Sequence, residues 1–599
     1  MATTEDINTA LGTAGVIWKI KDLYDSIQDK KIKEDMDWCR REAETIRDSF
    51  AGRIASLSAE KLFQLVKRLE ELSEVMGRIG TFAYLNFSTK VNDPEAGAFL
   101  QQVREFSSQV EKEIVFFELE WAKLPDEQAG PLLKDPVLSH YRHYLEAARR
   151  YKSHLLSETE ERLLIETSPA GRSSWISLFD KVLAFQRYGE DKRTQEEVLT
   201  DLYSQDRQTR KTAAQDLTEG LKKEIHILSH TFNTVLCDKM ISDRLRKYPS
   251  WISSMNLSNE LDDSTVDALI NSVTDRYGIV EDYYNIKKAI LNLDELCDYD
   301  RYAPLPWLPD RKVSWDEAKQ IVLGSFEKFS PDMAAIASDF FDKGWIHAPV
   351  IHGKTSGAFA HPATPSVHPF VLVNFTGTLR DVETLAHELG HGVHQVLAAG
   401  KGYFNSETPL TLAETASVFG EMLVFSDILE QIETPEEKLG FYAAKIESIF
   451  ATVFRQVAMN RFENGIHNHR RQKGELSQEE FSDLWMDTQS AMFKNSVTLT
   501  DNYRVWWSYI SHFIHVPGYV YSYAFGELLV LSLYSLYLEQ GQKFRDKYMK
   551  LLEAGGSDTP YRLLEPFGIN LRDNAFWDKG LSIIANMVKE AEGLAQQVS

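Results

Sequence analysis

Residues Leu385 to Gln395 read LAHELGHGVHQ and contain the spacing H-E-x-x-H. On an α-helix, residues four apart lie on one face, so His387 and His391 present two imidazoles to a single metal ion. Glu388 lies about 100° further round the helix, where it can hold a metal-bound water as a general base without becoming a ligand. The motif therefore predicts a zinc site that activates water for hydrolysis.

A catalytic zinc ion takes three protein ligands and keeps one position open. The downstream candidates for the third ligand are His394, Glu407, Glu414 and Glu421. Three ligands from one short helix fit a tetrahedral ion poorly, so His394 is expected to orient a ligand or to face the substrate. We predict Glu414 as the third ligand. Glu421 lies seven residues later on the same face of a helix opened by Pro409, and it is predicted to orient a ligand.

A second chemical group lies near the C-terminus, in SHFIHVPGYVYSYAFGELL, Ser511 to Leu529. Tyrosine hydroxyls and imidazoles donate hydrogen bonds, which the developing oxyanion of an acyl-transfer reaction needs. The alternative reading of the residues alone is an aromatic core segment. The candidate donors are His512, His515, Tyr519, Tyr521 and Tyr523.

These groups must be positioned by helices, because most of the chain shows a helical period. Ala59 to Ser88 and Arg210 to Leu236 place apolar residues three and four apart over many turns. Between Trp345 and Phe375 the period is lost and β-branched and aromatic runs appear, with PFVLVNF as the best strand. Helix resumes near Leu379. The expected fold is therefore mainly α, with a small β-sheet next to the H-E-x-x-H helix.

The segment HELGHGVHQ followed by LAETASVFGE resembles the thimet oligopeptidase family of zinc metallopeptidases, and within it the oligoendopeptidase F branch. In that family a Glu in an E-x-x-S-x-x-x-E helix is the third zinc ligand. The pattern falls here on Glu414, Ser417 and Glu421. The stretch from Ser511 to Leu529 also resembles the branch, whose His and Tyr residues face the zinc across a cleft.

The resemblance implies roles for the C-terminal residues. It favours Tyr523 and Tyr519 as transition-state donors, with His512 as a third catalytic group. His515, Tyr521 and His394 are then expected to contact the substrate.

The resemblance also implies a two-lobed helical body that encloses a deep channel, with the zinc ion at its base. Residues 1–205 are expected to form an N-terminal helical lobe, in which about 110–190 resemble the N-terminal part of oligopeptidase F. Residues 206–599 are expected to form the catalytic domain. PFVLVNF is a candidate edge strand for pairing with substrate backbone. The Gly-rich loop from Gly353 to Pro362 is either a mobile flap or a plain surface connection.

The implied function is zinc-dependent hydrolysis of internal peptide bonds in short unfolded peptides, by Glu388-assisted attack of a zinc-bound water, with one Zn²⁺ per chain. One alternative is a dipeptidyl carboxypeptidase-like exopeptidase, which needs a group such as Arg504 to bind a terminal carboxylate. The other is a non-catalytic helical protein that binds peptides.

The composition of the sequence indicates which binding partners and which cellular compartment are to be expected. The formal net charge of the 599 residues is −23, which disfavours nucleic acid and anionic membranes as partners. The three cysteines are far apart and form no C-x-x-C pattern, as in proteins of reducing compartments. The N-terminus has no basic leader, and no stretch approaches the roughly 20 apolar residues that span a bilayer. A cytoplasmic location is expected, and the sequence indicates no oligomeric state.

Overall fold

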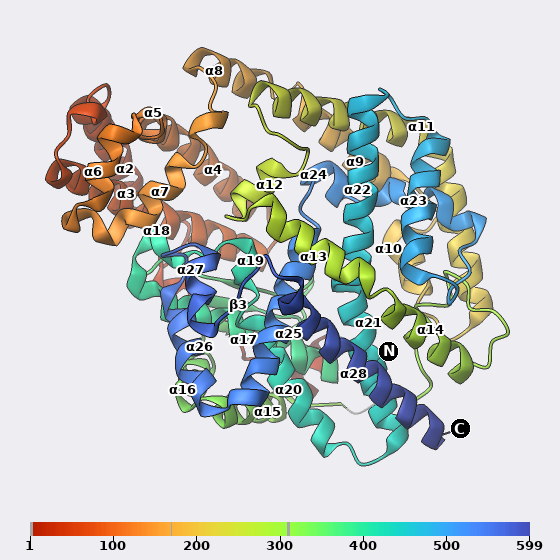
Figure 1. Ribbon diagram of the computed structural model, residues 1–599. Coiled ribbons are helices and arrows are strands. Elements are labelled where there is room, and N and C mark those ends of the chain that lie inside the picture. Colours follow the sequence, from red (N-terminus) through yellow and green to blue (C-terminus); the bar gives the residue numbers. More distant parts are fainter. Residues whose placement is uncertain (1–3, 169, 308–311, 599) are drawn as a thin grey trace. The chain divides into compact units, whose positions relative to one another are not determined.

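The computed structural model describes residues 4–168, 170–307 and 312–598. Helices form most of this chain, and three short strands form one sheet (Figure 1). The mainly α fold with a small sheet, predicted from the sequence, is confirmed. Among the described residues, every helix is too short or too polar to cross a membrane.

The chain divides into two compact units, and each unit is assembled from three separate segments. Unit 1 comprises Met1–Lys152, Asp310–Gln431 and Leu536–Ile569. Unit 2 comprises Ser153–Pro309, Ile432–Ser535 and Asn570–Ser599. The division at residue 205 that the sequence suggests stays a prediction.

Unit 1 contains the sheet and the H-E-x-x-H helix. Its core joins the first helices to the middle strand, because Phe370 and Leu372 pack with buried side chains from the first 145 residues. The helices of unit 1 are α1 (Thr4–Leu11), α2 (Lys30–Phe50), α3 (Ala59–Ser88), α4 (Pro94–Ile114), α5 (Phe116–Lys123), α6 (Asp126–Lys134), α7 (Arg142–Arg149), α15 (Trp315–Phe329), α16 (Pro331–Asp342), α17 (Leu379–Ala398), α18 (Tyr403–Ser406), α19 (Leu410–Ala413), α20 (Ser417–Gln431), α26 (Gln542–Ala554) and α27 (Pro560–Leu564). Its 3₁₀ turns are η1 (Ile20–Asp22), η2 (Ile54–Ser56), η3 (Pro136–Tyr141), η5 (Ala399–Lys401) and η7 (Glu565–Phe567).

The regular elements of unit 2 among its described residues are helices, and the unit has a separate aromatic core, in which Phe232, Trp485 and Trp507 are buried together. Its helices are α8 (Glu158–Thr167), α9 (Arg172–Phe185), α10 (Gln195–Asp201), α11 (Arg207–Leu245), α12 (Ser253–Ser258), α13 (Asp263–Asp275), α14 (Gly278–Ile290), α21 (Pro435–Thr452), α22 (Phe454–Gln472), α23 (Gln478–Phe493), α24 (His512–His515) and α28 (Asn574–Val598). The long turn η6 (Asp501–Tyr509) precedes α24, whereas η4 (Lys152–His154) and α25 (Tyr521–Gln540) cross the unit boundaries.

The sheet has the strand order β1-β3-β2. The middle strand β3 (Phe370–Leu372) pairs in parallel with β1 (Ile346–His347) and antiparallel with β2 (Phe359–His361). The prediction that PFVLVNF supplies an edge strand is therefore wrong, because β3 has a partner on both sides. Its side chains are completely buried, which explains why its apolar run was the clearest strand signal.

Candidate metal centre and active site

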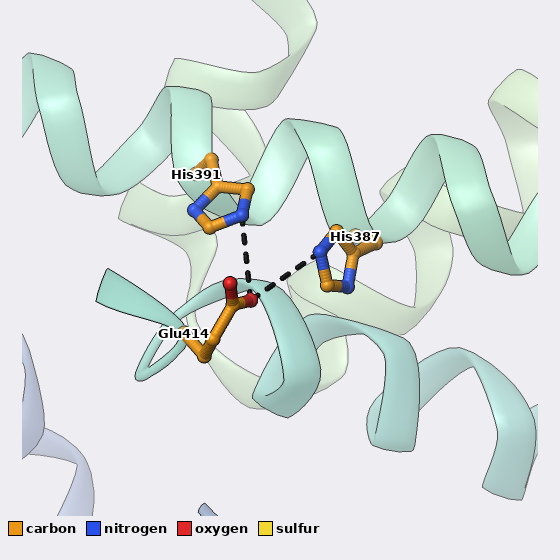
Figure 2. Close-up of side chains that lie close together, drawn as sticks. All are labelled: His387, His391 and Glu414. Carbon is orange, nitrogen blue, oxygen red and sulfur yellow. Dashed lines mark ion pairs between the residues drawn. The ribbon is translucent and has the colours of Figure 1, made fainter. Parts of the chain in front are cut away.

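The two histidines of the motif lie on α17, which begins with a complete capping box. The Thr378 hydroxyl accepts the backbone N–H of Asp381, and the Asp381 carboxylate accepts the N–H of Thr378. The apolar stripe that includes Leu385 and Leu389 is fully buried. The helix is therefore fixed at its start and along one face, and the imidazoles of His387 and His391 extend from another (Figure 2).

Glu414 brings its carboxylate to both imidazoles. Its Oε2 lies 3.4 Å from Nε2 of His387 and 3.4 Å from Nε2 of His391 (Figure 2). Glu414 does not lie within a helix, because the chain turns between the end of α19 at Ala413 and the start of α20 at Ser417. The expectation that Glu414 and Glu421 share one helix face is thus wrong, although both reach His387.

The turn that carries Glu414 packs directly on α17. A Cβ atom added to Gly390 would lie 2.4 Å from the carbonyl oxygen of Ala416, so only glycine allows this approach. On the other side of the turn, the Tyr548 hydroxyl of α26 donates to the carbonyl of Thr415 over 2.7 Å. The Ser417 hydroxyl donates to Glu414 Oε2 over 2.6 Å. Backbone packing and hydrogen bonds thus place the carboxylate.

Glu421 lies on the far side of the His387 ring. Its Oε2 is 3.2 Å from Nδ1 of His387, which leaves Nε2 facing Glu414. Burial alone lowers the pKa of His387, but the hydrogen bond to Glu421 and the charge of Glu414 more than offset it and raise the pKa to about 9. A carboxylate bonded to the far nitrogen orients the ring and increases its basicity as a ligand.

Glu388 follows His387 on α17 and is 7% exposed. Burial raises the pKa of Glu388 to about 7, against the opposing effects of His387 and a hydrogen bond with the backbone of Ala360. A carboxyl group with a pKa near neutrality can both accept and return a proton, as a general base and acid must.

His394 is on the same helix but apart from the ligand atoms. Its ring is buried, and burial lowers its pKa to about 4, so it is uncharged at neutral pH. Within the described chain, the group of side chains that can hold a metal ion consists of His387, His391 and Glu414, whose ligand atoms lie within 4.8 Å of one another. Two imidazoles and one carboxylate match the donor set of catalytic zinc, which leaves a fourth position open.

A cavity of about 1200 Å³ adjoins this group within unit 1. The edge strand β2 lines it, together with His387, Glu388 and His394 of α17. The carbonyl of Ala360, in the middle of β2, accepts a weak hydrogen bond from Gln395 Nε2 over 3.4 Å. The candidate metal ligands and the edge strand β2 thus line the same cavity.

The second predicted group forms a cluster of its own in unit 2. His512 Nε2 lies 3.2 Å from the Tyr523 hydroxyl, and the rings of Tyr519 and Tyr523 meet edge to face at 5.0 Å. Burial and the charges of His515 and Arg455 lower the pKa of His512, which favours its uncharged form. Two hydroxyls and a neutral imidazole therefore lie together, as hydrogen-bond donors to an oxyanion would.

Tyr521 and His515 have other contacts. Tyr521 is completely buried, and its hydroxyl accepts a hydrogen bond from Asn259 Nδ2 over 2.9 Å, as a core tyrosine does. Nε2 of His515 lies 2.8 Å from an oxygen of Asp180. Sequence reasoning missed the partners Asn259, Asp180 and Tyr548, since they come from distant segments without a local signal.

The chain matches known peptidases over nearly its whole length. A family model described as "Peptidase family M3" matches residues 201–583, and one described as "Oligopeptidase F" matches residues 120–185. The oligopeptidase PepF of Bacillus subtilis (strain 168) is 24% identical over 97% of this chain and 87% of its own length. An oligoendopeptidase F homolog of Lactococcus lactis subsp. lactis is 23% identical over 98% of each chain.

Solved structures share the fold. A putative peptidase from Chlamydophila abortus has a TM-score of 0.84 and 24% identity over 97% of this chain and 98% of its own. The oligoendopeptidase-F of Enterococcus faecium has a TM-score of 0.71 and 21% identity over 95% and 99%. The first family model covers more than half of the chain, so the protein belongs to peptidase family M3. It is a metalloendopeptidase, which confirms the resemblance noted in the sequence.

Proposed function

We propose that the protein is a zinc-dependent oligopeptidase that hydrolyses internal bonds of short unfolded peptides. One observation carries the proposal: a single oxygen of Glu414 lies 3.4 Å from an imidazole nitrogen of both His387 and His391. These three residues are the proposed ligands of one Zn²⁺, and Glu421 orients His387. A bound zinc ion supplies Lewis acidity, which lowers the pKa of water to about 7 and polarises a carbonyl group.

The protein's own groups carry the proton. Glu388 takes a proton from the attacking water and passes it to the leaving amine, as its pKa of about 7 allows. Tyr523 and Tyr519, with His512, are the proposed donors to the oxyanion. His394 and His515 are proposed to contact the peptide, whereas the buried Tyr521 is proposed as support for the Tyr519–Tyr523 segment.

We further propose that substrate backbone pairs with β2. It is an edge strand and lines the cavity beside Glu388, whereas β3 already has two neighbours. Strand pairing recognises the backbone of an extended chain and tolerates varied side chains, which suits an enzyme for unfolded peptides.

The exopeptidase alternative has less support. Arg504, its candidate for binding a terminal carboxylate, forms an ion pair of 2.5 Å with Asp483. We also propose a cytoplasmic protein without nucleic-acid or membrane partners. The net charge of −23 and three cysteines without a disulfide partner support this.

The test is a digest of a peptide series of increasing length, read by mass spectrometry, with zinc-loaded and chelator-treated enzyme. We expect internal cleavage of short peptides, loss of activity after chelation and recovery on adding Zn²⁺. A folded protein and its denatured form serve as matched substrates, and the folded form is expected to resist. Cleavage of the folded form at the same rate contradicts the substrate class. Full activity of metal-free enzyme contradicts the zinc assignment.

A further inference from the structure

Unit 2 contains one buried and one partly exposed arginine that form no ion pair with an acid among the described residues. Arg301 follows α14 and is 4% exposed, and Arg455 is the second residue of α22. The groups that act most strongly on their charges are tyrosine hydroxyls and, for Arg455, the other arginine. Nε of each guanidinium is buried without a hydrogen-bond partner. Burying a guanidinium is costly unless it is paired, and here two like charges share one site.

The Tyr302 hydroxyl is close to both positive charges. It accepts a hydrogen bond of 2.6 Å from Nη2 of Arg301, and the charge of Arg455 also acts on it. Burial tends to raise the pKa of Tyr302, but the two positive charges hold it below its ordinary value. The Arg301 guanidinium also lies over the rings of Tyr302, at 4.4 Å, and Tyr503, at 5.1 Å. Aromatic faces stabilise a cation only in part and leave its N–H donors unused.

Asp298 acts on the charge of Arg301, but the two form no ion pair among the described residues. Oδ1 of Asp298 accepts the backbone N–H of Thr500 over 2.8 Å, and its Oδ2 is buried without a hydrogen-bond partner. Burial raises the pKa of Asp298, which weakens it as a counter-ion. Arg301 is buried, whereas Arg455 and Tyr302 are partly exposed, so parts of these two side chains reach solvent.

We propose that the guanidiniums of Arg301 and Arg455, with the Tyr302 hydroxyl beside Arg301, form a subsite that binds a carboxylate of the peptide substrate. Arginine binds carboxylates through two charge-assisted hydrogen bonds, which would use the unpaired N–H groups. The charge of Arg455 acts on His512, which belongs to the cluster with Tyr519 and Tyr523. The proposal deepens the proposed function and rests on it. The carboxylate is the C-terminus of the peptide or an acidic side chain.

The test compares three matched peptides: one with a free C-terminus and an internal Glu, its C-terminal amide, and its Glu→Gln form. Binding of fluorescently labelled peptides to the Glu388→Gln enzyme is measured by anisotropy, and KM and kcat are measured with otherwise wild-type enzyme. We expect one of the two neutralised peptides to bind about tenfold or more weakly. Loss with the amide identifies the C-terminus as the ligand, and loss with Gln identifies the side chain.

The variant Arg455→Met is expected to remove that preference by weakening only the favoured peptide. Arg276→Met, at a partly buried arginine of the same unit whose ion pair with Asp578 spans 4.0 Å, is the matched control and is expected to keep the preference. Arg455→Lys keeps the positive charge and is expected to retain part of the binding preference. Thermal unfolding checks that each variant folds. Equal binding of all three peptides to the parent enzyme, or an unchanged preference in a folded Arg455→Met, overturns the proposal. If the peptides show a clear binding preference but the wild-type enzyme cleaves none of them, the proposed function is refuted instead.

Discussion

Replacing Gly390 with alanine tests whether the packing of α17 on the Glu414 turn builds the metal centre. The added Cβ would lie 2.4 Å from the Ala416 carbonyl oxygen and 2.7 Å from the Cα of Ser417. Ordinary contacts of a Cβ atom begin near 3.4 Å, so the helix and the turn must separate by about 1 Å. Alanine improves helix propensity by about 1 kcal/mol, but overpacking costs about 1–3 kcal/mol. The net loss of stability is therefore modest, about 0–2 kcal/mol.

The effect on metal binding should be larger than the effect on stability. Glu414 lies two residues from Ala416, and metal–ligand distances tolerate changes of only about 0.2 Å. We expect Gly390→Ala to weaken zinc binding about ten- to a hundredfold, as loss of a ligand's supporting contacts does in other sites.

The assay is zinc competition against a chromophoric chelator, together with urea unfolding of the metal-free proteins. Gly324→Ala is the matched control, because Gly324 lies in a helix of the same unit and its added Cβ meets no atom within 4 Å. The control should gain about 0.5–1 kcal/mol and bind zinc normally. If Gly390→Ala also gains stability and keeps wild-type zinc affinity, the close packing of the turn does not position Glu414.

Four further predictions concern single side chains. Glu388→Gln should keep its zinc, measured by atomic absorption, and lose at least about a hundredfold in kcat, and normal turnover would remove Glu388 as the general base. Glu414→Ala should lose stoichiometric zinc whereas His394→Ala keeps it, and the reverse result would make His394 the ligand. Tyr523→Phe should lower kcat without loss of stability. Tyr521→Phe should lower the free energy of unfolding in urea by about 1 kcal/mol, because it removes the hydrogen-bond partner of Asn259. Equal kinetic effects of the two variants would contradict a catalytic role for Tyr523 and a structural role for Tyr521. Burial lowers the pKa of His347 to about 3, so the unfolded chain, with a pKa near 6.5, takes up a proton that the folded protein excludes. His347 therefore destabilises the folded protein increasingly as the pH falls below about 6.5. The free energy of unfolding should fall faster with decreasing pH in the wild type than in His347→Gln, by at most about 1.4 kcal/mol per pH unit. Parallel pH curves of the two proteins would contradict the lowered pKa of His347.

The parts of the site that depend on local spacing could be predicted from the sequence. His387 and His391 lie four residues apart, so any helix brings them together, and the capping signal at Thr378 makes that helix well defined. The sequence also predicted that Glu421 orients one of the ligands, and the structure places its carboxylate next to His387. The prediction of a continuous helix through Glu414 was wrong. The spacing of residues in the sequence does not reveal that Gly390 allows the Ala416 backbone to pack closely against α17.

Long-range partners were beyond the reach of sequence patterns. Tyr548 follows Thr415 by 133 positions, and its hydrogen bond depends on how α26 packs rather than on any motif. The same holds for strand order: PFVLVNF was recognisable as a strand, but its middle position depends on β1 and β2, which have two and three residues. Arg301 and Arg455 lie in segments that show no chemical signal until folding brings them to Tyr302.

The three-segment construction of unit 1 has a consequence for biosynthesis. The ribosome adds His387, His391 and Glu414 more than a hundred residues before it adds Tyr548, whose hydroxyl donates to the turn next to Glu414. Domains that fold during translation can close only when their last segment has emerged. A nascent chain therefore carries the complete H-E-x-x-H motif for most of the remaining synthesis without the packed turn. The contact between Tyr548 and the turn next to Glu414 therefore forms only after most of the chain has been synthesised.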